Sequence, residues 1–502
     1  MFGLVVVPFA GARLWRLSSS CLWFDEIFSI HAARHGWWEL IKFAAADMVH
    51  PPLFYALLKI WISIGGESVF WVRLLPVLFS LATIVPFWFL CRLLNLTQWE
   101  MVLALLLMAV SRYLIGYAQE VRMYSPLLFF SVCSLWLFLR FLKSEKSSGA
   151  VLGALTAGNF LLVYTHYFGW AVIATEALLL LIWKRKHLAH FLISVAALLL
   201  LYSPWIYVVA ASREQGRGLA QNLGWLQRPG LKDLKLYFVR MSEPFLFTQF
   251  PGEPVYDRLA EWAVLFLFGI PLGIFIFRTL RARPRQSRDH WLLVLAFAPV
   301  AGAFLFSWIL PYPIWGNRHL LICAVPYFIL AALALGRLKP EWLRYVVMLL
   351  LGSWMFLAAG LALFTRAPTY TWCSWEQLVE QMPPPESASP TPIYAFEDLV
   401  GYHLWFTGTQ TQRPLAVTVI KDVPGLNEDR AFFLPRRFDE IRVLPQPNVT
   451  GEHVWLAFRS RQWNENAVPL SLVRAQGYQV KQVRSTGAQG EQSFLVELIR
   501  AP

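Results

Sequence analysis

The sequence predicts an α-helical polytopic membrane protein with a soluble α/β domain at its C-terminal end. Over 502 residues the chain is 57% hydrophobic and only 15% charged, a composition that a soluble domain of this length does not show. Apolar segments long enough to cross a bilayer recur from the first residues to about Phe364. Beyond them, Pro-rich polar stretches alternate with strand-like runs such as HVWLAF. We therefore expect a membrane domain over 1–365 and a soluble domain over 366–502.

About eleven segments have the length and composition of transmembrane helices. The first, MFGLVVVPFAGARLW, has no basic stretch and no clear cleavage site, so we expect an uncleaved span. The segment 51–66 is apolar but short and carries Lys59 in its middle, so we expect it to lie in the interface. The predicted spans cover about 2–17, 70–91, 100–117, 123–142, 149–165, 168–183, 189–210, 259–278, 290–310, 319–336 and 343–364.

The distribution of charge predicts the orientation of these spans. The net charge is +13, but the tail from Arg366 is nearly balanced, which argues against a nucleic-acid partner. The excess lies between the spans, around 140–146, 184–186, 278–288 and 337–344. Cytoplasmic loops are rich in Lys and Arg, whereas counting 51–66 as a span would put all four clusters outside. We therefore expect a multi-pass protein of the plasma (inner) membrane with a cytoplasmic N-terminus, and with the loops 17–69 and 212–258 and the soluble domain on the extracytoplasmic side.

Charged residues gather at this outer face. Glu120 and Arg122 lie in GYAQEVRMYSP, between two apolar runs. A charged side chain near hydrocarbon costs a few kcal/mol, so a pair of them at this place suggests a function. An acidic pair, Asp25 and Glu26, lies in CLWFDEIFS on the same side. The other polar residues expected there are Gln119 and Tyr124 of the same turn, His166, Tyr167, Arg213, Arg217 and Arg318.

The ordered set CLWFDEIFSI, HPPLFYALLKIW, RLLPVLFSLATI and YAQEVRMYSPLL resembles the GT-C glycosyltransferases of the protein O-mannosyltransferase and aminoarabinose transferase type. The resemblance covers roughly residues 15–330 and implies a GT-C fold and transfer of a sugar from a polyprenyl phosphate carrier. It also implies that Asp25 is the catalytic base, that Glu120 is a second acid near the site, and that Arg318 helps to hold the donor. His319 stands where the family usually has tyrosine, and His50 opens the second of these motifs.

The chemistry of the transfer independently requires these residue types. A carboxylate can take the proton of the acceptor, which contributes a factor of roughly 10²–10⁴ in rate. The guanidinium group of arginine is permanently charged and can form two hydrogen bonds to the departing phosphate. A single base without a covalent intermediate implies inversion at the anomeric carbon. We thus predict an inverting hexosyl- or pentosyltransferase whose acceptor is a lipid, a glycan or a protein. The predicted catalytic residues are Asp25, Glu26 and Glu120; Arg122, Tyr124, Arg213, Arg217, Arg318 and His319 bind the donor; His50, Gln119, His166 and Tyr167 line the site.

Several alternatives stay open at this stage. Asp25 and Glu26 could cap a helix, and Glu120 and Arg122 could form a structural ion pair. A transporter or lipid flippase for a glycolipid is the alternative function, although such proteins place ionisable groups near the bilayer midplane. No cofactor is assigned, a divalent metal stays open, and we identify no Cys/His spacing typical of a metal site. Cys21 and Cys373 would face an oxidising compartment, but we do not predict a disulfide because no spacing pattern supports one.

Overall fold

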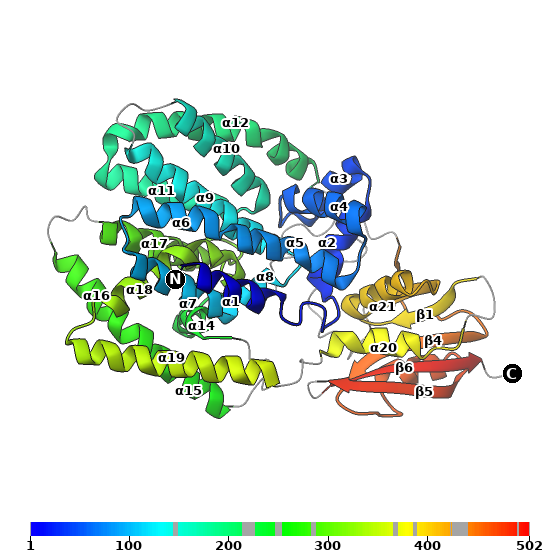
Figure 1. Cartoon of the computed structure of the whole chain (residues 1–502). Coiled ribbons are helices and arrows are strands. Elements are labelled where there is room, and N and C mark those ends of the chain that lie inside the picture. The colour runs from blue at the N-terminus through cyan, green and yellow to red at the C-terminus, as the bar shows by residue number, and fades with distance from the viewer. Residues whose placement is uncertain are drawn as a thin grey trace.

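The chain folds into a large helical part followed by a small mixed sheet (Figure 1). The structure is a computed structural model, which describes residues 2–143, 149–212, 226–245, 254–282, 288–364, 370–384, 389–421, 423, 440–488 and 491–500. The helices of the first part are α1 (Phe2–Leu14), α2 (Phe24–Arg34), α3 (Trp37–Asp47), α4 (Leu53–Gly65), α5 (Val69–Ala82), α6 (Ile84–Leu93), α7 (Gln98–Val110), α8 (Arg112–Ala118), α9 (Tyr124–Lys143), α10 (Gly149–Thr165), α11 (Gly169–Trp183), α12 (Leu188–Ser212), α14 (Leu231–Ser242), α15 (Pro254–Val264), α16 (Ile270–Arg281), α17 (Arg288–Ile309), α18 (Ala324–Gly336) and α19 (Glu341–Phe364), with the short η1 (Arg185–His187), η2 (Leu265–Gly269) and η3 (Asn317–Cys323).

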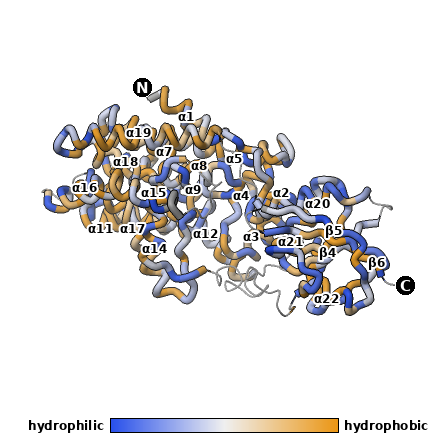
Figure 2. Tube along the Cα trace, turned by 90° about the horizontal axis from the view of Figure 1, so that it is seen from below, coloured by the Kyte–Doolittle hydropathy of each residue, from blue (hydrophilic) through white to orange (hydrophobic). Residues whose placement is uncertain are grey.

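The surface of the helical part is apolar. Seven helical segments among the described residues are long and apolar enough to cross a membrane, and five shorter apolar helices accompany them. Large side chains such as Leu200, Phe356 and Phe364 are 74%, 84% and 90% exposed, which water would not favour. Figure 2 shows hydrophobic residues concentrated along the bundle and more hydrophilic residues over the C-terminal part. The chain is therefore an integral membrane protein, and the predicted fold class is confirmed, whereas the count of eleven spans stays a prediction.

One predicted span, 100–117, is divided in the structure. It consists of α7, which Thr97 and Glu100 cap at its N-terminus, and α8, with a break at Ser111. The Ser111 hydroxyl donates to the carbonyl of Met241 at 2.7 Å, and Ser111 forms a β-bridge with Pro244. The backbone amide of Arg112 donates to the carbonyl of Glu243 at 2.9 Å, and the carbonyl of Val110 accepts from the amide of Phe245 at 2.7 Å. Backbone groups that would continue the helical ladder thus bond another segment, so the chain turns there. The turn directs α8 and the following Gln119–Met123 segment toward the first loop.

Basic residues from several predicted cytoplasmic clusters lie together at one end of the bundle. The Lys143 ammonium donates to the carbonyl of Leu93 at 2.5 Å, and Arg288 donates to the carbonyl of Leu94 at 2.9 Å. Arg337 and Arg288 both pair with Asp289. Helix α9 has 20 residues, a length of about 30 Å, and places Tyr124 and Lys143 at its opposite ends. The basic end and the predicted outer face are thus separated by the length of a span.

The C-terminal part is a six-stranded sheet with flanking helices. The strand order is β3-β2-β1-β4-β6-β5. Strands β3, β2, β1 and β4 are parallel, and β6 pairs antiparallel with both β4 and β5. One mixed sheet thus contains a parallel half and a final antiparallel hairpin. Helix α21 packs against β2 and also contacts α2 of the first loop. The elements are η4 (Thr371–Cys373), α20 (Ser374–Glu380), β1 (Thr391–Ala395), α21 (Asp398–Gln410), β2 (Leu415–Ile420), β3 (Arg442–Leu444), β4 (His453–Ser460), α22 (Val468–Arg474), β5 (Tyr478–Ala488) and β6 (Glu491–Arg500).

A disulfide joins the two parts. Cys21 and Cys373 are bonded, with their Cα atoms 5.4 Å apart, so our expectation of no disulfide was wrong. The two residues are 352 positions apart in the chain, and only the fold brings the first loop beside η4. The predicted domain boundary at 365/366 lies outside the described residues.

Candidate active site

The N-terminus of α2 presents the two acidic residues to different partners. Glu26 is 1% exposed and forms a two-pronged ion pair with Arg73 of α5, with N–O distances of 2.8 and 2.7 Å. Its carboxylate also accepts from the backbone amides of Trp23 at 3.1 Å and Val121 at 3.0 Å. Glu26 therefore caps α2 and ties it to α5 and to the turn after α8. With its lone pairs engaged, this carboxylate is better suited to position the helix than to accept a proton from a substrate.

Asp25 points to the centre of the predicted site. Its Oδ2 accepts a hydrogen bond from Nη1 of Arg318 at 3.0 Å, the only bond described for this carboxylate, and its side chain is 16% exposed. Arg318 belongs to η3, which packs against α9. A carboxylate with one partner and partial access keeps lone pairs for an incoming hydroxyl.

Arg122 is a buried cation held largely by neutral groups. Its Nη1 donates to the carbonyl of Asp25 at 3.2 Å and to the hydroxyl of Ser29 at 3.3 Å, and its Nη2 lies 3.3 Å from Nδ1 of His50. Among the described residues no carboxylate is ion-paired with Arg122, so the alternative of a structural Glu120–Arg122 pair finds no support. A buried charge without a counter-ion is costly, which favours an anionic ligand here.

Three histidines line the other side of Arg122. The rings of His50 and His166 lie 5.4 Å apart, and those of His166 and His319 lie 5.0 Å apart. Burial, and then the charge of Arg122, lowers the pKa of His50 well below its usual range. Burial, and then His319 and His50, lowers the pKa of His166 in the same way. The imidazoles of His50 and His166 are therefore neutral and leave the arginines as the cations.

Glu120 lies at the border between these groups and a cavity. Burial, followed by the charges of Asp25 and Glu26, raises the pKa of Glu120 to about 8, against the opposing effect of Arg318 and Arg122. The cavity has a volume of about 760 Å³ and is mostly apolar. Besides Glu120 and the Glu26–Arg73 pair, residues of α1, α8 and α19 line it, together with Trp23, Tyr370 and Trp372. Asp25 is not one of its lining residues, so the cavity approaches the site from the side of Glu120.

Several buried polar atoms around this site have no hydrogen-bond partner among the described residues. Buried polar groups are almost always satisfied, so a cluster of exceptions indicates a place where a ligand or water supplies the missing bonds. They are Oη of Tyr55 and Tyr124, Oε1 of Glu120, Nε of Arg122, Nε2 of His166 and Nδ1 of His319.

The remaining predicted residues are placed less centrally. Gln119 donates to the carbonyls of Arg13 and Trp15, which ties the turn to the end of α1. The Tyr167 hydroxyl accepts from the indole of Trp205 at 3.3 Å, at the edge of the site. The guanidinium of Arg318 lies 6.0 Å from the ring centre of Tyr124, close enough for a cation–π contact. Arg213 and Arg217 lie outside the described residues.

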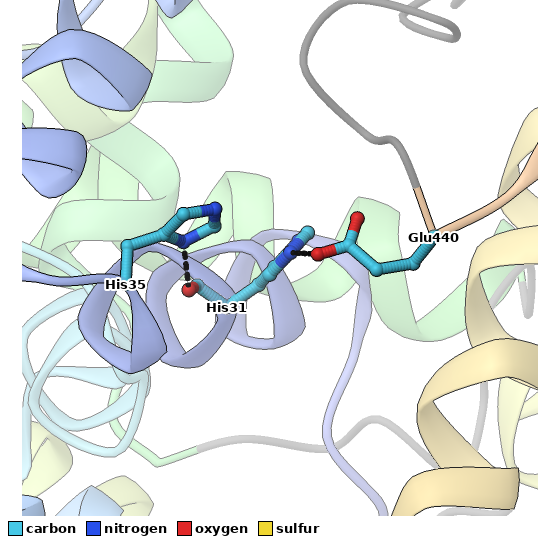
Figure 3. A group of neighbouring side chains, drawn as sticks. All are labelled: His31, His35 and Glu440. Atoms are coloured by element: carbon cyan, nitrogen blue, oxygen red, sulfur yellow. Dashed lines mark hydrogen bonds and ion pairs between the residues drawn. The ribbon is translucent and has the colours of Figure 1, made fainter.

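Sequence reasoning missed two groups. Arg73 was part of a quoted motif, and an arginine at the start of an apolar helix is a signal for a buried partner, which proves to be Glu26. A group of His31, His35 and Glu440 lies where α2 meets the C-terminal part (Figure 3). We did not predict this group, although His31 and His35 have the i, i+4 spacing of helical ligand pairs.

Comparison with known proteins agrees with this architecture. The dolichyl-phosphate-mannose-protein mannosyltransferase family matches residues 49–208, about a third of the chain. No curated protein sequence matches the chain. The structure of ArnT from Cupriavidus metallidurans in the apo state superposes with a TM-score of 0.57 at 14% identity, over 98% of this chain and 96% of that one. The form bound to undecaprenyl phosphate gives 0.56 at the same identity and coverage.

A second solved structure is similar over most of the chain. The oligosaccharyltransferase AglB from Archaeoglobus fulgidus, in complex with an inhibitory peptide and a dolichol-phosphate, gives a TM-score of 0.50 at 15% identity, over 81% of this chain. The chain spans 63% of the length of AglB. The resemblance found in the sequence is thus confirmed, and the fold is of the GT-C type.

Proposed function

We propose that this chain is a GT-C glycosyltransferase that transfers a sugar from a polyprenyl-phosphate carrier to an acceptor hydroxyl on the extracytoplasmic side. The observation that carries the proposal is the meeting of one partly accessible carboxylate, Asp25, with two arginines, Arg122 and Arg318, at one end of a membrane bundle. The similarity to ArnT, whose structure was determined with undecaprenyl phosphate, supports the choice of donor.

The two arginines would bind the donor phosphate. Among the described residues, Arg122 is buried without a carboxylate partner, and Arg318 has one hydrogen bond, to Asp25. An anion between them would supply the missing counter-charge and could accept from Nε of Arg122, which is otherwise unsatisfied. The neutral His50 and His166 add hydrogen-bonding groups without more charge.

Asp25 would act as the general base. The acceptor oxygen attacks the anomeric carbon while its proton passes to the Asp25 carboxylate, and the bond from that carbon to the phosphate oxygen breaks. The electron pair leaves with the polyprenyl phosphate, whose growing charge Arg122 and Arg318 stabilise. A single displacement inverts the configuration. Glu26, which we first counted among the catalytic residues, would instead position Asp25 by fixing the N-terminus of α2.

The apolar cavity next to Glu120 would hold a hydrocarbon chain. It lies between α1, α8 and α19, and its volume of about 760 Å³ matches a lipid segment rather than a sugar alone. Because it approaches the site from the side of Glu120, it would bring either the prenyl chain of the donor or an acyl chain of a lipid acceptor to the reacting groups. A glycan or protein acceptor would not need it.

The charge distribution supports the proposed orientation. The cluster of Lys143, Arg288 and Arg337 lies at the end of the bundle opposite to Arg122, and cytoplasmic ends are rich in such residues. This supports a plasma (inner) membrane protein with a cytoplasmic N-terminus, a membrane domain over 1–365, and the site and the domain 366–502 outside.

One residue favours the alternative of a transporter. Glu176 is fully buried in α11, where its carboxyl bonds the hydroxyl of Ser134 at 2.9 Å, so a charged residue type does lie within a predicted span. The Ser134 hydroxyl also lies 2.5 Å from Oδ1 of Asn159, which makes a polar network between α9, α10 and α11, while Oε2 of Glu176 has no hydrogen-bond partner among the described residues. Such a network also serves to join spans, and Glu176 is on a different helix from every predicted site residue.

The proposal is tested by offering the purified protein a panel of polyprenyl-phosphate sugars with lipid, glycan and peptide acceptors. Release of the free lipid phosphate with at least one donor is expected, and it should persist in Glu176→Gln. Transport of a glycolipid across vesicles without release of lipid phosphate would contradict the proposal and favour the transporter.

A further inference from the structure

Two histidines and a glutamate meet where the first loop contacts the C-terminal domain. His31 and His35 are one helical turn apart on α2, and Glu440 precedes β3. One ligand atom from each residue lies within 4.8 Å of the others, and Nε2 of His31 is 2.9 Å from Oε1 of Glu440 (Figure 3). No other group of three such residues is found in the part of the chain that the structure describes.

The rings are already held through their other nitrogens. Nδ1 of His35 is 2.8 Å from the carbonyl of His31, so it donates to that carbonyl and leaves Nε2 as an acceptor. Nδ1 of His31 is 3.0 Å from the Tyr402 hydroxyl. Histidines that bind metals are usually oriented in this way, with one nitrogen on a carbonyl or hydroxyl and the other on the ion.

Aromatic rings and two paired cations surround the group in the described structure. The ring of Trp405 lies 4.6 Å from that of His31, and the ring of Phe43 lies 4.7 Å from that of His35. Two cations are near, but Arg34 is paired with Glu67 at 2.6 Å and the Lys59 ammonium is held by the carbonyls of Ala33 and His35. The one carboxylate of the group therefore faces the two imidazoles.

We propose that His31, His35 and Glu440 bind a divalent transition-metal ion of the zinc class, which fastens α2 to the C-terminal domain. Two imidazoles and one carboxylate are a ligand set that zinc accepts, with a fourth position for water. Ligand atoms around a tetrahedral zinc ion lie about 3.4 Å apart, given bonds of about 2.1 Å. The closest pair, at 2.9 Å, would widen slightly, and pairs as far apart as 4.8 Å would close by up to about 1.4 Å.

The position of this site gives it a consequence for the catalytic helix. His31 lies 6 residues after Asp25 on the same helix, and the N-terminus of α2 is already fixed by Glu26. A metal at the far end of α2 would fix that end to Glu440 in the segment before β3, beside α21, whose Tyr402 bonds His31. The alternative to a metal site is a simple hydrogen bond that neutral His31 donates to Glu440. In that case His35 has no function in binding Glu440.

The test is a metal titration of the full-length protein in detergent. The protein is stripped with a chelator and titrated with Zn²⁺ in a competing chelator buffer, and Co²⁺ serves as a spectroscopic probe through its visible absorption. We expect about one tight zinc per chain, as for a single site, and at least about tenfold weaker binding in His35→Gln and in Glu440→Gln. His453→Gln is the matched control, because His453 also pairs with a glutamate, Glu497 at 2.6 Å, but belongs to no such group of three.

The outcomes separate the two accounts. Zinc should also raise the melting temperature of the parent and of His453→Gln, but not of His35→Gln. No zinc bound more tightly than about micromolar, or equal affinity in the parent and both ligand variants, would overturn the proposal. Glu440→Gln keeps the hydrogen bond to His31 and decides the matter if His35→Gln does not fold. Neither the zinc titration nor the melting temperature depends on glycosyl transfer. A negative result would therefore overturn the metal site and leave the proposed function untouched.

Discussion

The carboxylate of Asp25 and the guanidinium of Arg318 lie 3.0 Å apart although 293 positions separate them in the chain. In the described structure this bond joins the proposed base to a proposed phosphate ligand. A donor phosphate would compete for the same guanidinium, so donor binding would loosen Asp25 at the point where it must accept a proton. In the proposed mechanism, this bond would couple occupancy of the donor site to the freedom of Asp25.

Arg318→Gln should weaken use of the donor. The amide retains a hydrogen-bond donor but loses the charge that a phosphate needs, so the KM for the polyprenyl-phosphate sugar should rise at least about tenfold. Steady-state kinetics with varied donor measure this. Arg337→Gln is the control, because Arg337 pairs with Asp289 at the basic end of the bundle. Equal donor KM values in Arg318→Gln and the parent would remove Arg318 from the phosphate site.

Arg73→Met should destabilise the protein without acting on the donor directly. It leaves the Glu26 carboxylate buried without its counter-ion, which costs about 3 kcal/mol in similar pairs. The folded fraction after a heating series, followed by size-exclusion chromatography, shows the change. Lys42→Met breaks the exposed Lys42–Glu39 pair and should cost about 0.5 kcal/mol or less. If both variants melted alike, the Glu26–Arg73 pair would not be the anchor of α2.

Glu120 should contribute a pH dependence to stability. Its pKa is about 8 in the folded protein, above the ordinary value of 4.5, so the folded form keeps a proton that the unfolded form has lost. This contribution is therefore present at low pH and falls as the pH rises between these two values. The stability of the parent, relative to Glu120→Gln, should be lower at pH 9 than at pH 6. Parallel profiles for the two proteins would show that Glu120 titrates normally.

The disulfide should be detectable by counting thiols. Alkylation of the denatured protein without reductant should modify Cys91, Cys133 and Cys323 alone, and reduction should expose two more thiols. Mass spectrometry of the peptides measures this in protein isolated from membranes. Since disulfides persist in oxidising compartments, the bond also tests the outward placement of Cys21 and Cys373. Five free thiols before reduction would argue against both.

Much of the fold follows from local patterns, whereas the contacts of the site do not. Apolar runs of about 20 residues identify spans because the bilayer sets their length, and the predicted topology puts Asp25, Arg122 and Arg318 at one face. The different partners of Asp25 and Glu26 could not be predicted, because Glu26 pairs with Arg73, which comes from another helix. The Cys21–Cys373 bond and the partnership of His31 with Glu440 join segments hundreds of residues apart, for which no periodicity gives a signal.

The break at Ser111 has a similar cause. Residues 100–117 are mostly apolar and predict one helix, but the amide of Arg112 donates to the carbonyl of Glu243 and the carbonyl of Val110 accepts from the amide of Phe245, so the chain turns. A tertiary contact thereby overrides the local preference for a continuous helix. The turn brings Glu120 close to Asp25 and Glu26.

The central claim, that Asp25 is the general base, is tested most directly by Asp25→Asn. The amide has nearly the same shape and can still bond Arg318, but it cannot accept a proton from the acceptor at neutral pH. Two quantities are measured with the purified variant: the release of lipid phosphate and the binding of the polyprenyl-phosphate donor. The release should fall by at least about a hundredfold, while donor binding is retained. Turnover within about tenfold of the parent, in a folded variant that binds donor, would contradict the assignment and direct attention to Glu120.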